Sequence, residues 1–419
     1  MSAYISYPDP YVQPLVLHAL DEAAENCRLL SSSSELSQTT GPSLQVAAYE
    51  DIDFDHAMQN PATSLICSYV IRKALIRKHY LSNTVSTWLV KHPSSVLASS
   101  FEPCTHFELD FAEFLDDALV DAWDLNESMV RNDSIDDNVS KEWWILKPGM
   151  SDGGNGIRLF ASLSDLQTIF EGWEPETDED EESDGDQDQE ELEQTAPARH
   201  TDGTMTTQLR HFIAQPYIKH PLLLPEYGNR KFHIRTYVVA VGALKVFVYR
   251  EMLALFAAKH YILPGAQANE LDLGQHLTNT CSQDEATKAS SVHRFLDLNS
   301  MSLSSRWKDR IFEQICDISG EIFEAAAKEQ MIHFQTLPNA FEIFGVDFLV
   351  DNDFNVWLLE LNAYPDFKQT GASLQDSVVG GLFNAVVDVA IKPFFESGSA
   401  GDAKNHSMPL VKHIDLGRR

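Results

Sequence analysis

An apolar segment, a lysine and a glycine-rich loop follow one another in residues 143–160, WWILKPGMSDGGNGIRLF. Glycines let backbone N–H groups approach an anion closely, and Lys147 at the end of the apolar segment adds a point charge that suits phosphate. Neither the G-K-[ST] sequence of a Walker loop nor the G-x-G-x-x-G sequence of a dinucleotide-binding fold is present. By itself this pattern favours a plain glycine-rich hairpin loop over a phosphate site.

Basic side chains are concentrated in a second pattern, residues 230–252, RKFHIRTYVVAVGALKVFVYREM. Gly242 divides it into two strand-like runs and favours a two-residue turn between them. Such a turn would place Arg235 opposite Arg250, with Lys231 on the same face because side chains alternate along a strand. Like charges opposite one another are destabilising, so the pattern predicts an anion bound between them. The alternative is that both guanidinium groups point into solvent.

Acidic side chains form the third pattern, residues 344–362, FGVDFLVDNDFNVWLLELN. A polar turn centred near Asp353 would set Asp347 opposite Glu360, with Asn362 on the same face. Two carboxylates and an amide inside apolar strands are costly unless a cation or hydrogen-bond donors compensate them. Oxygen-only ligands favour magnesium, which binds a few carboxylates together with substrate phosphates. The alternative is a structural role, with both acids paired to arginines.

Both strands and helices are expected around these patterns. Residues 143–147, 232–249 and 356–361 are rich in residues that favour strands, and residues 306–329 have a helical pattern. The sequence therefore predicts a mixed α/β (α+β) architecture.

The composition limits the function classes further. The chain has 419 residues and a formal net charge of -32, which argues against binding to nucleic acid or to anionic membranes. Residues 174–193 hold 13 acidic side chains and no basic one, so we predict a disordered insertion over residues 173–206. Five scattered cysteines, no apolar run of membrane-spanning length and no signal-like start lead us to expect a cytoplasmic protein.

The order of these motifs resembles that of a known family. A lysine before a glycine-rich loop, then Q-P-Y-I, R-K-F-x-I-R, V-Y-R-E, H-L-T-N, F-G-V-D-F-L-V and W-L-L-E-L-N follow one another as in the tubulin tyrosine ligase family, and the chain resembles a fungal-type member. The resemblance implies an ATP-grasp fold with two subdomains enclosing ATP and an N-terminal accessory domain. The implied division is 1–70 for the accessory domain, 71–218 and 219–395 for the two subdomains, and 396–419 for a flexible tail.

The resemblance also implies roles for individual residues. Those assigned to ATP are Lys73, Lys147, Gly153, Gly154, Gly156, Gln215, Pro216, Tyr217, Ile218, Lys231 and Asp347. Those assigned to magnesium are Asp347, Glu360 and Asn362, and those assigned to catalysis and substrate contact are Lys231, Arg235, Arg250 and Asn279. The expected cofactors are ATP and Mg²⁺, and the expected partners are a free amino acid and a protein acceptor with an acidic tail, tubulin above all.

Two residues depart from the family pattern. Pro216 stands where the family usually has a lysine in the adenine-binding segment; proline lacks an N–H group but keeps a carbonyl that can accept from adenine. His233 stands where the family usually has an aspartate, which replaces a fixed negative charge by a group expected to titrate near neutral pH. Both changes concern substrate recognition more than the fold.

The implied activity is the joining of an amino acid to a protein through an acyl phosphate. Two other hypotheses remain open at the level of the sequence: an ATP-grasp ligase with a non-tubulin acceptor, and an ATP-binding pseudoenzyme that acts as an interaction scaffold.

Overall fold

The computed structural model describes residues 1–7, 9–23, 27–39, 41–149, 154–173, 211–267, 271–280, 283–396 and 406–416. Gly153 and the acidic run at 174–193 lie outside these residues, so the expectations for them stay predictions. Contacts divide the chain into a first unit, Met1–Pro103 with Ile218–Arg419, and a second unit, Cys104–Tyr217. Residues 71–103, which the sequence-based division assigned to the central subdomain, are thus grouped with the first unit.

The first unit begins with a parallel four-stranded sheet in the order β2-β1-β3-β4. Its strands are β1 (Ser2–Ser6), β2 (Arg28–Leu30), β3 (Ser43–Ala47) and β4 (Ser64–Ile66), and the nearby helices are α1 (Gln13–Ala23), α2 (Phe54–Gln59), α3 (Lys73–Ile76) and α4 (Lys78–Lys91). Every residue of β3 is buried, as is typical of a central strand in a parallel sheet.

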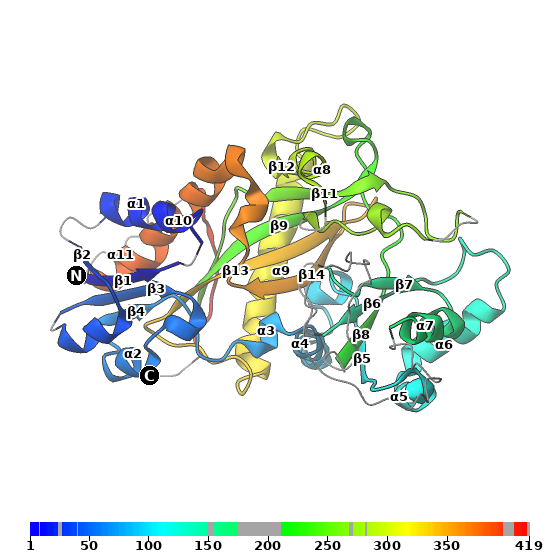
Figure 1. Cartoon of the computed structure of the whole chain (residues 1–419), viewed down its shortest axis with the longest axis horizontal. Helices are drawn as coiled ribbons and strands as arrows, with labels where there is room; N and C mark the ends of the chain where they lie inside the picture. Colours follow the sequence, from blue (N-terminus) through cyan, green and yellow to red (C-terminus); the bar gives the residue numbers. More distant parts are fainter. Residues whose placement is uncertain are drawn as a thin grey trace, which may run out of the picture. The chain divides into compact units, whose positions relative to one another are not determined.

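A seven-stranded sheet forms the larger part of the first unit (Figure 1). Its strands are β9 (Arg230–Val241), β10 (Lys245–Val248), β11 (Leu253–His260), β12 (Val292–Arg294), β13 (Phe341–Val350), β14 (Val356–Ala363) and β15 (Leu410–His413), and its helices are α8 (Glu285–Ala289), α9 (Trp307–Glu329), α10 (Gly381–Val386) and α11 (Lys392–Phe395). β9 pairs with β13 along one edge and with β10 and then β11 along the other. The predicted helix at 306–329 is confirmed by α9.

β9 is central because it has apolar side chains on both faces. Phe232 and Ile234 belong to the core that contains the apolar stripe of α9, whereas Tyr237 and Val239 belong to a second core on the opposite face. Alternation along the strand therefore directs Lys231, His233 and Arg235 to the face of Tyr237.

The second core includes a long helical stretch that the sequence analysis underestimated. In the part of the chain that the structure describes, Ala372–Phe395 is the one helical stretch whose length and mean hydropathy of 1.6 would allow it to cross a membrane. Half of its apolar window is buried, and Val378, Leu382 and Val386 pack with Tyr237 in the second core. The expectation that no apolar run has this length was wrong, and a buried core helix meets the same criteria.

The last described segment contains a strand, β15, within the region predicted as a flexible tail, residues 396–419. β15 pairs with β10 in antiparallel fashion, and Met408 and Ile414 on either side of it are buried. Apolar residues in a polar context were enough to add a strand to the sheet, although their number was too small for a clear strand pattern.

The second unit is an antiparallel four-stranded sheet, β5-β8-β6-β7, covered by helices. The strands are β5 (Thr105–Glu108), β6 (Trp144–Pro148), β7 (Arg158–Phe160) and β8 (His211–Pro216), and the helices are α5 (Leu115–Ala118), α6 (Trp123–Asp133) and α7 (Leu163–Glu171). Phe107, Phe170 and Phe212 form the centre of its core.

Candidate functional site

Three charged residues lie side by side on neighbouring strands of the large sheet. In the backbone register, Arg235 of β9 is opposite Asp347 of β13, and Asp347 is opposite Glu360 of β14. The predicted pairing of Asp347 with Glu360 is therefore confirmed. The turn differs from the prediction because the register shifts by one residue just beyond this pair, between Asp347 and Phe348.

Arg235 and Asp347 form a bidentate ion pair inside the protein. Arg235 Nε donates to Asp347 Oδ1 at 2.5 Å and Nη2 donates to Oδ2 at 2.9 Å. Both residues are buried, with 7% and 4% of their surface exposed. Burial alone would lower the pKa of Arg235, but the Asp347 carboxylate outweighs burial and the pKa is raised. Arg235 therefore stays charged, and its two hydrogen bonds hold the carboxylate of Asp347 in a fixed orientation.

His233 is buried beside this ion pair. Its Nδ1 is 2.6 Å from Thr278 Oγ1, and its Nε2 lies 3.6 Å from Asp347 Oδ1 and has no hydrogen-bond partner. Burial lowers the pKa of His233, with Arg235 adding to the effect and Asp347 opposing it. The prediction of a group titrating near neutral pH is thus replaced by a neutral imidazole at pH 7.

Glu360 and Asn362 lie on the same face of β14, as predicted. Asn362 Nδ2 donates to Glu360 Oε1 at 3.3 Å, and Lys78 Nζ of α4 lies 3.3 Å from Glu360 Oε2. Sequence reasoning missed Lys78. Lys73, predicted as a phosphate contact, is exposed at the start of α3, and its role stays a prediction. The run IRKALIRKHYL contains the triplet I-R-K twice, and only the fold identifies the lysine that reaches the acidic hairpin.

Arg250 does not join this cluster, which corrects the predicted pairing with Arg235. The turn after β9 is one residue longer than predicted, β10 ends at Val248, and the strand residue next to Arg235 is Leu253 of β11. Arg250 instead donates to Asp309 Oδ1 of α9 at 2.5 Å and lies over the Phe312 ring.

The predicted H-L-T-N segment reaches the charged face through two of its residues. Thr278 contacts His233, and His276 lies close enough to Lys231 for the lysine charge to act on it. Burial first and Lys231 second lower the pKa of His276 to about 4. Lys231 is itself buried, so a cationic residue faces the same side of β9 as Arg235. The contact predicted for Asn279 remains a prediction.

The nucleotide residues predicted in the second unit also come together. Lys147 Nζ of β6 donates to Gln215 Oε1 of β8 at 2.8 Å, and Tyr217 N donates to Trp143 O. Pro216 is the last residue of β8, where a missing N–H group is tolerated. Gly154 and Gly156 have φ angles of 82° and 71°, a backbone region that favours glycine. Ile218 is the first residue of the chain's return to the first unit.

The acidic hairpin fits magnesium by the chemistry of its donors. Asp347, Glu360 and Asn362 supply carboxylate and amide oxygens, the ligands that Mg²⁺ prefers. Among the described residues no group of three or more His, Cys, Asp or Glu side chains could form a complete metal cage. The set therefore suits an ion that takes its other ligands from phosphate and water.

Comparisons with known proteins agree with this geometry. The model of the tubulin-tyrosine ligase family matches residues 73–398. The chain is 44% identical over 417 residues to a protein of Schizosaccharomyces pombe named probable tubulin–tyrosine ligase, covering 99% of this chain and 97% of the relative. It is 40% identical to the Saccharomyces cerevisiae protein named probable tubulin–tyrosine ligase PBY1, covering 97% of this chain but only 54% of that protein.

A solved structure has the same fold over the whole length. The C-terminal domain of K. lactis Pby1, described as an ATP-grasp enzyme that interacts with the mRNA decapping enzyme Dcp2, aligns with a TM-score of 0.70 and 33% identity over 99% of both chains. The family match covers most of the chain, and the structural match extends to both units. The chain therefore belongs to the tubulin-tyrosine ligase family and has an ATP-grasp fold.

Proposed function

We propose that this protein is an ATP- and Mg²⁺-dependent ligase that joins an amino acid to a protein acceptor. The observation that carries the proposal is the row of Arg235, Asp347 and Glu360 on one face of the large sheet, flanked by Lys231 and Lys78. Arg235 and Asp347 are buried, whereas Glu360 is partly exposed. Burying charged groups costs desolvation free energy. A cluster of such groups is therefore a candidate functional site, and here its charges suit phosphate and metal.

In this reaction a carboxylate oxygen attacks the γ-phosphorus of ATP, giving an acyl phosphate and ADP. An amine then attacks the acyl carbon, loses a proton, and phosphate leaves. Lys231 would supply positive charge for the phosphoryl and acyl oxygens, and Arg235, whose charge is balanced by Asp347, would add its remaining N–H donors. Asp347, Glu360 and Asn362 would hold magnesium, whose charge would offset that of the phosphate oxygens. Arg235 keeps the Asp347 carboxylate oriented for this role.

Lys147 and Gln215 serve the nucleotide in the second unit. The bond between them leaves the lysine anchored at the end of β6, next to the glycine loop that contains Gly154 and Gly156. The same segment continues through Pro216 and Tyr217 to Ile218, where backbone groups would contact adenine. Lys73 stays the proposed additional phosphate contact, and Lys78 of α4, which lies 3.3 Å from Glu360, is added to the site.

The acceptor that we favour is the acidic C-terminal tail of tubulin, in keeping with the names of the two fungal relatives. Because the chain is itself strongly acidic, only local cations can attract such a tail. Arg250 remains a candidate contact for the acceptor, although it acts apart from Arg235. A cytoplasmic location is part of the same proposal, since tubulin is there.

A second candidate is a ligase with a non-tubulin acceptor. It is favoured by the description of the K. lactis domain as an ATP-grasp enzyme that interacts with Dcp2. A non-catalytic scaffold is less well supported, because the residues that the resemblance assigns to phosphate and magnesium, Lys147, Asp347, Glu360 and Asn362, are all present in the sequence.

The test measures ADP release with ATP, magnesium and labelled amino acids, using tubulin, an acidic tail peptide, a neutral peptide of equal length, and cell lysate as acceptors. We expect labelling of tubulin or the acidic peptide, and an approximately hundredfold loss of turnover in Lys147→Ala. Lys91→Ala is the control, because Lys91 is an exposed lysine paired with Glu329. Labelling of another lysate protein would favour the second candidate, and no labelling at all would refute ligase activity.

Glu360→Gln separates the metal role from the fold. The change is nearly isosteric but removes one of two carboxylates, so we expect a much higher magnesium concentration for half-maximal ATP binding. The same magnesium requirement in the variant and the unmodified protein would show that Glu360 is not a ligand.

A further inference from the structure

One stretch of the second unit combines exposed aromatic side chains with a high density of acids. Residues 108–127 hold eight acidic side chains and no lysine or arginine. Within the same stretch Phe111, Phe114, Val120 and Trp123 are exposed, with Trp123 at 72%. Among the described residues, every exposed phenylalanine or tryptophan lies between positions 111 and 123. We call residues 108–127 the acidic-aromatic surface.

Buried apolar residues of the same segment attach this surface to the core of the second unit. Seven apolar residues recur every three or four positions and pack in the core of the second unit: Leu109, Ala112, Leu115, Leu119, Ala122, Leu125 and Met129. The exposed side chains lie between these buried positions in the sequence. Because the buried positions hold the backbone in place, the exposed side chains cannot turn into the core. Phe111 and Phe114 also contact each other edge to face, with ring centroids 6.2 Å apart.

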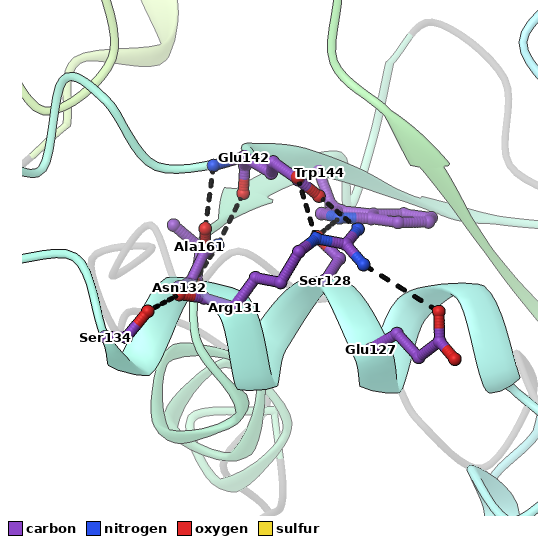
Figure 2. Close-up of polar contacts among 8 residues, drawn as sticks. All are labelled: Glu127, Ser128, Arg131, Asn132, Ser134, Glu142, Trp144 and Ala161. Carbon is purple, nitrogen blue, oxygen red and sulfur yellow. Dashed lines mark hydrogen bonds and ion pairs between the residues drawn. The ribbon is translucent and has the colours of Figure 1, made fainter.

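Hydrogen bonds also hold α6 against the sheet of the second unit (Figure 2). Trp144 Nε1 donates to Ser128 Oγ at 2.8 Å, and Asn132 Nδ2 donates to the backbone oxygens of Glu142 and Ala161 at 2.7 and 2.8 Å. These bonds use the inner face of α6, and Trp123 at its first turn stays exposed.

The one basic residue of α6 does not change the charge of this region. Arg131 donates to both carboxylate oxygens of Glu142, at 3.0 and 2.8 Å, and also lies 3.8 Å from Glu127, as Figure 2 shows. Its charge is thus shared between two acids outside the aromatic part of the surface.

We infer that the acidic-aromatic surface docks a cationic amphipathic segment of a partner protein. Exposed aromatic side chains on a rigid base are the typical anchors of protein interfaces. The acids around them select a partner with lysine or arginine next to apolar side chains. They repel nucleic acid and anionic membranes, and they disfavour a second copy of this chain, which would bring the same acids face to face.

The surface is separate from the residues proposed for catalysis. None of Lys147, Gln215, Lys231, Arg235, Asp347 and Glu360 belongs to it, so docking and ligation can be tested independently.

The test measures binding of fluorescent peptides to the full chain by anisotropy. The probe is a short peptide of alternating lysine and leucine, and its control is a lysine–serine peptide of equal length and charge. Because a protein of net charge -32 attracts any polycation, the informative quantity is the preference for the leucine peptide. We expect this preference to fall about tenfold in a Phe111→Ser/Trp123→Ser variant.

Two control variants separate the contributions. Ile332→Ser removes an exposed apolar side chain in the first unit, at 77% exposure, and should leave the preference unchanged. A second variant removes three acids of the surface, Asp116→Asn/Asp117→Asn/Asp121→Asn. It should lower the binding affinity for both peptides more than a matched change of three exposed acids in the first unit, Glu50→Gln/Asp51→Asn/Asp55→Asn.

Equal binding of the two peptides, or a preference that survives the Phe111→Ser/Trp123→Ser change, would overturn the inference. Concentration-dependent dimerisation in sedimentation experiments that the same change abolishes would also overturn it, in favour of self-association. Thermal melting of each variant verifies folding. Because the substituted positions are exposed, we expect little change in melting temperature.

Discussion

The two charged hairpins of the large sheet are alike in sequence but differ in structure. In β13 and β14 both strands continue through the charged positions, so Asp347 and Glu360 are neighbours as their spacing predicts. After β9, the strand β10 has only four residues, and the chain leaves the sheet before β11 begins. Arg250 lies in that break and turns to α9. The Asp347–Glu360 pair keeps the predicted partners because the one-residue register shift next to it offsets the different turn, whereas no strand pairing extends from β10 to Arg250.

The difference also changes the meaning of the basic cluster. The sequence predicted an anion between two arginines, whereas Arg235 is neutralised by Asp347 from the other neighbouring strand. A strand in the middle of a sheet has two neighbours, and charges that look unbalanced along one hairpin can be balanced by the second.

The largest expected effect comes from breaking the buried pair. Arg235→Ala would leave Asp347 as a buried charge without its bidentate partner, because only 4% of Asp347 is exposed. We expect a loss of about 3–5 kcal/mol in the free energy of unfolding, measured by urea denaturation. A loss as small as that of a surface pair would show that the carboxylate is solvated or otherwise compensated.

A second buried acid of β13 gives an effect that depends on pH. Glu342 forms an ion pair with Arg72, with Oε1 2.7 Å from Nε, but burial outweighs Arg72 and raises the pKa of Glu342 from 4.5 to about 7. The folded protein then binds more protons than the unfolded chain between these values, so stability should fall as pH rises from 4.5 to 7, by up to about 3 kcal/mol. In Glu342→Gln this decrease in the free energy of unfolding between pH 4.5 and 7 should disappear. An identical pH dependence in the variant and the unmodified protein would contradict the role of Glu342.

A smaller effect is expected where the hairpin passes closest to Arg235. Gly345 lies opposite Asn362, and an added Cβ would come within 2.9 Å of Pro365 Cβ and 3.4 Å of Arg235 Cδ. Gly345→Ala should cost about 1–3 kcal/mol and displace the guanidinium group. The measurement is urea unfolding combined with the magnesium requirement for ATP binding. Gly41→Ala is the control, since a Cβ there meets nothing within 4 Å.

The smallest effect is expected for Arg250. Its ion pair with Asp309 is partly exposed, with side-chain exposures of 37% and 52%. Arg250→Ala should change stability by at most about 1 kcal/mol, in contrast to Arg235→Ala. If Arg250 contacts the acceptor, the Michaelis constant for an acidic peptide should rise while that for ATP stays the same. A loss of stability equal to that of Arg235→Ala would contradict the separation of the two arginines.

The sequence by itself determined the mixed architecture, the helix at α9, the strands that hold the motifs, and the pairing of Asp347 with Glu360. Each follows from local periodicity, which neighbouring residues set. Only the tertiary structure decided that Arg235 pairs with Asp347, that Lys78 and not Lys73 reaches Glu360, and that burial keeps His233 neutral. These depend on residues far apart in the chain. Strand order, crossover path and depth of burial bring such residues together, and none of the three is encoded in the spacing within one segment.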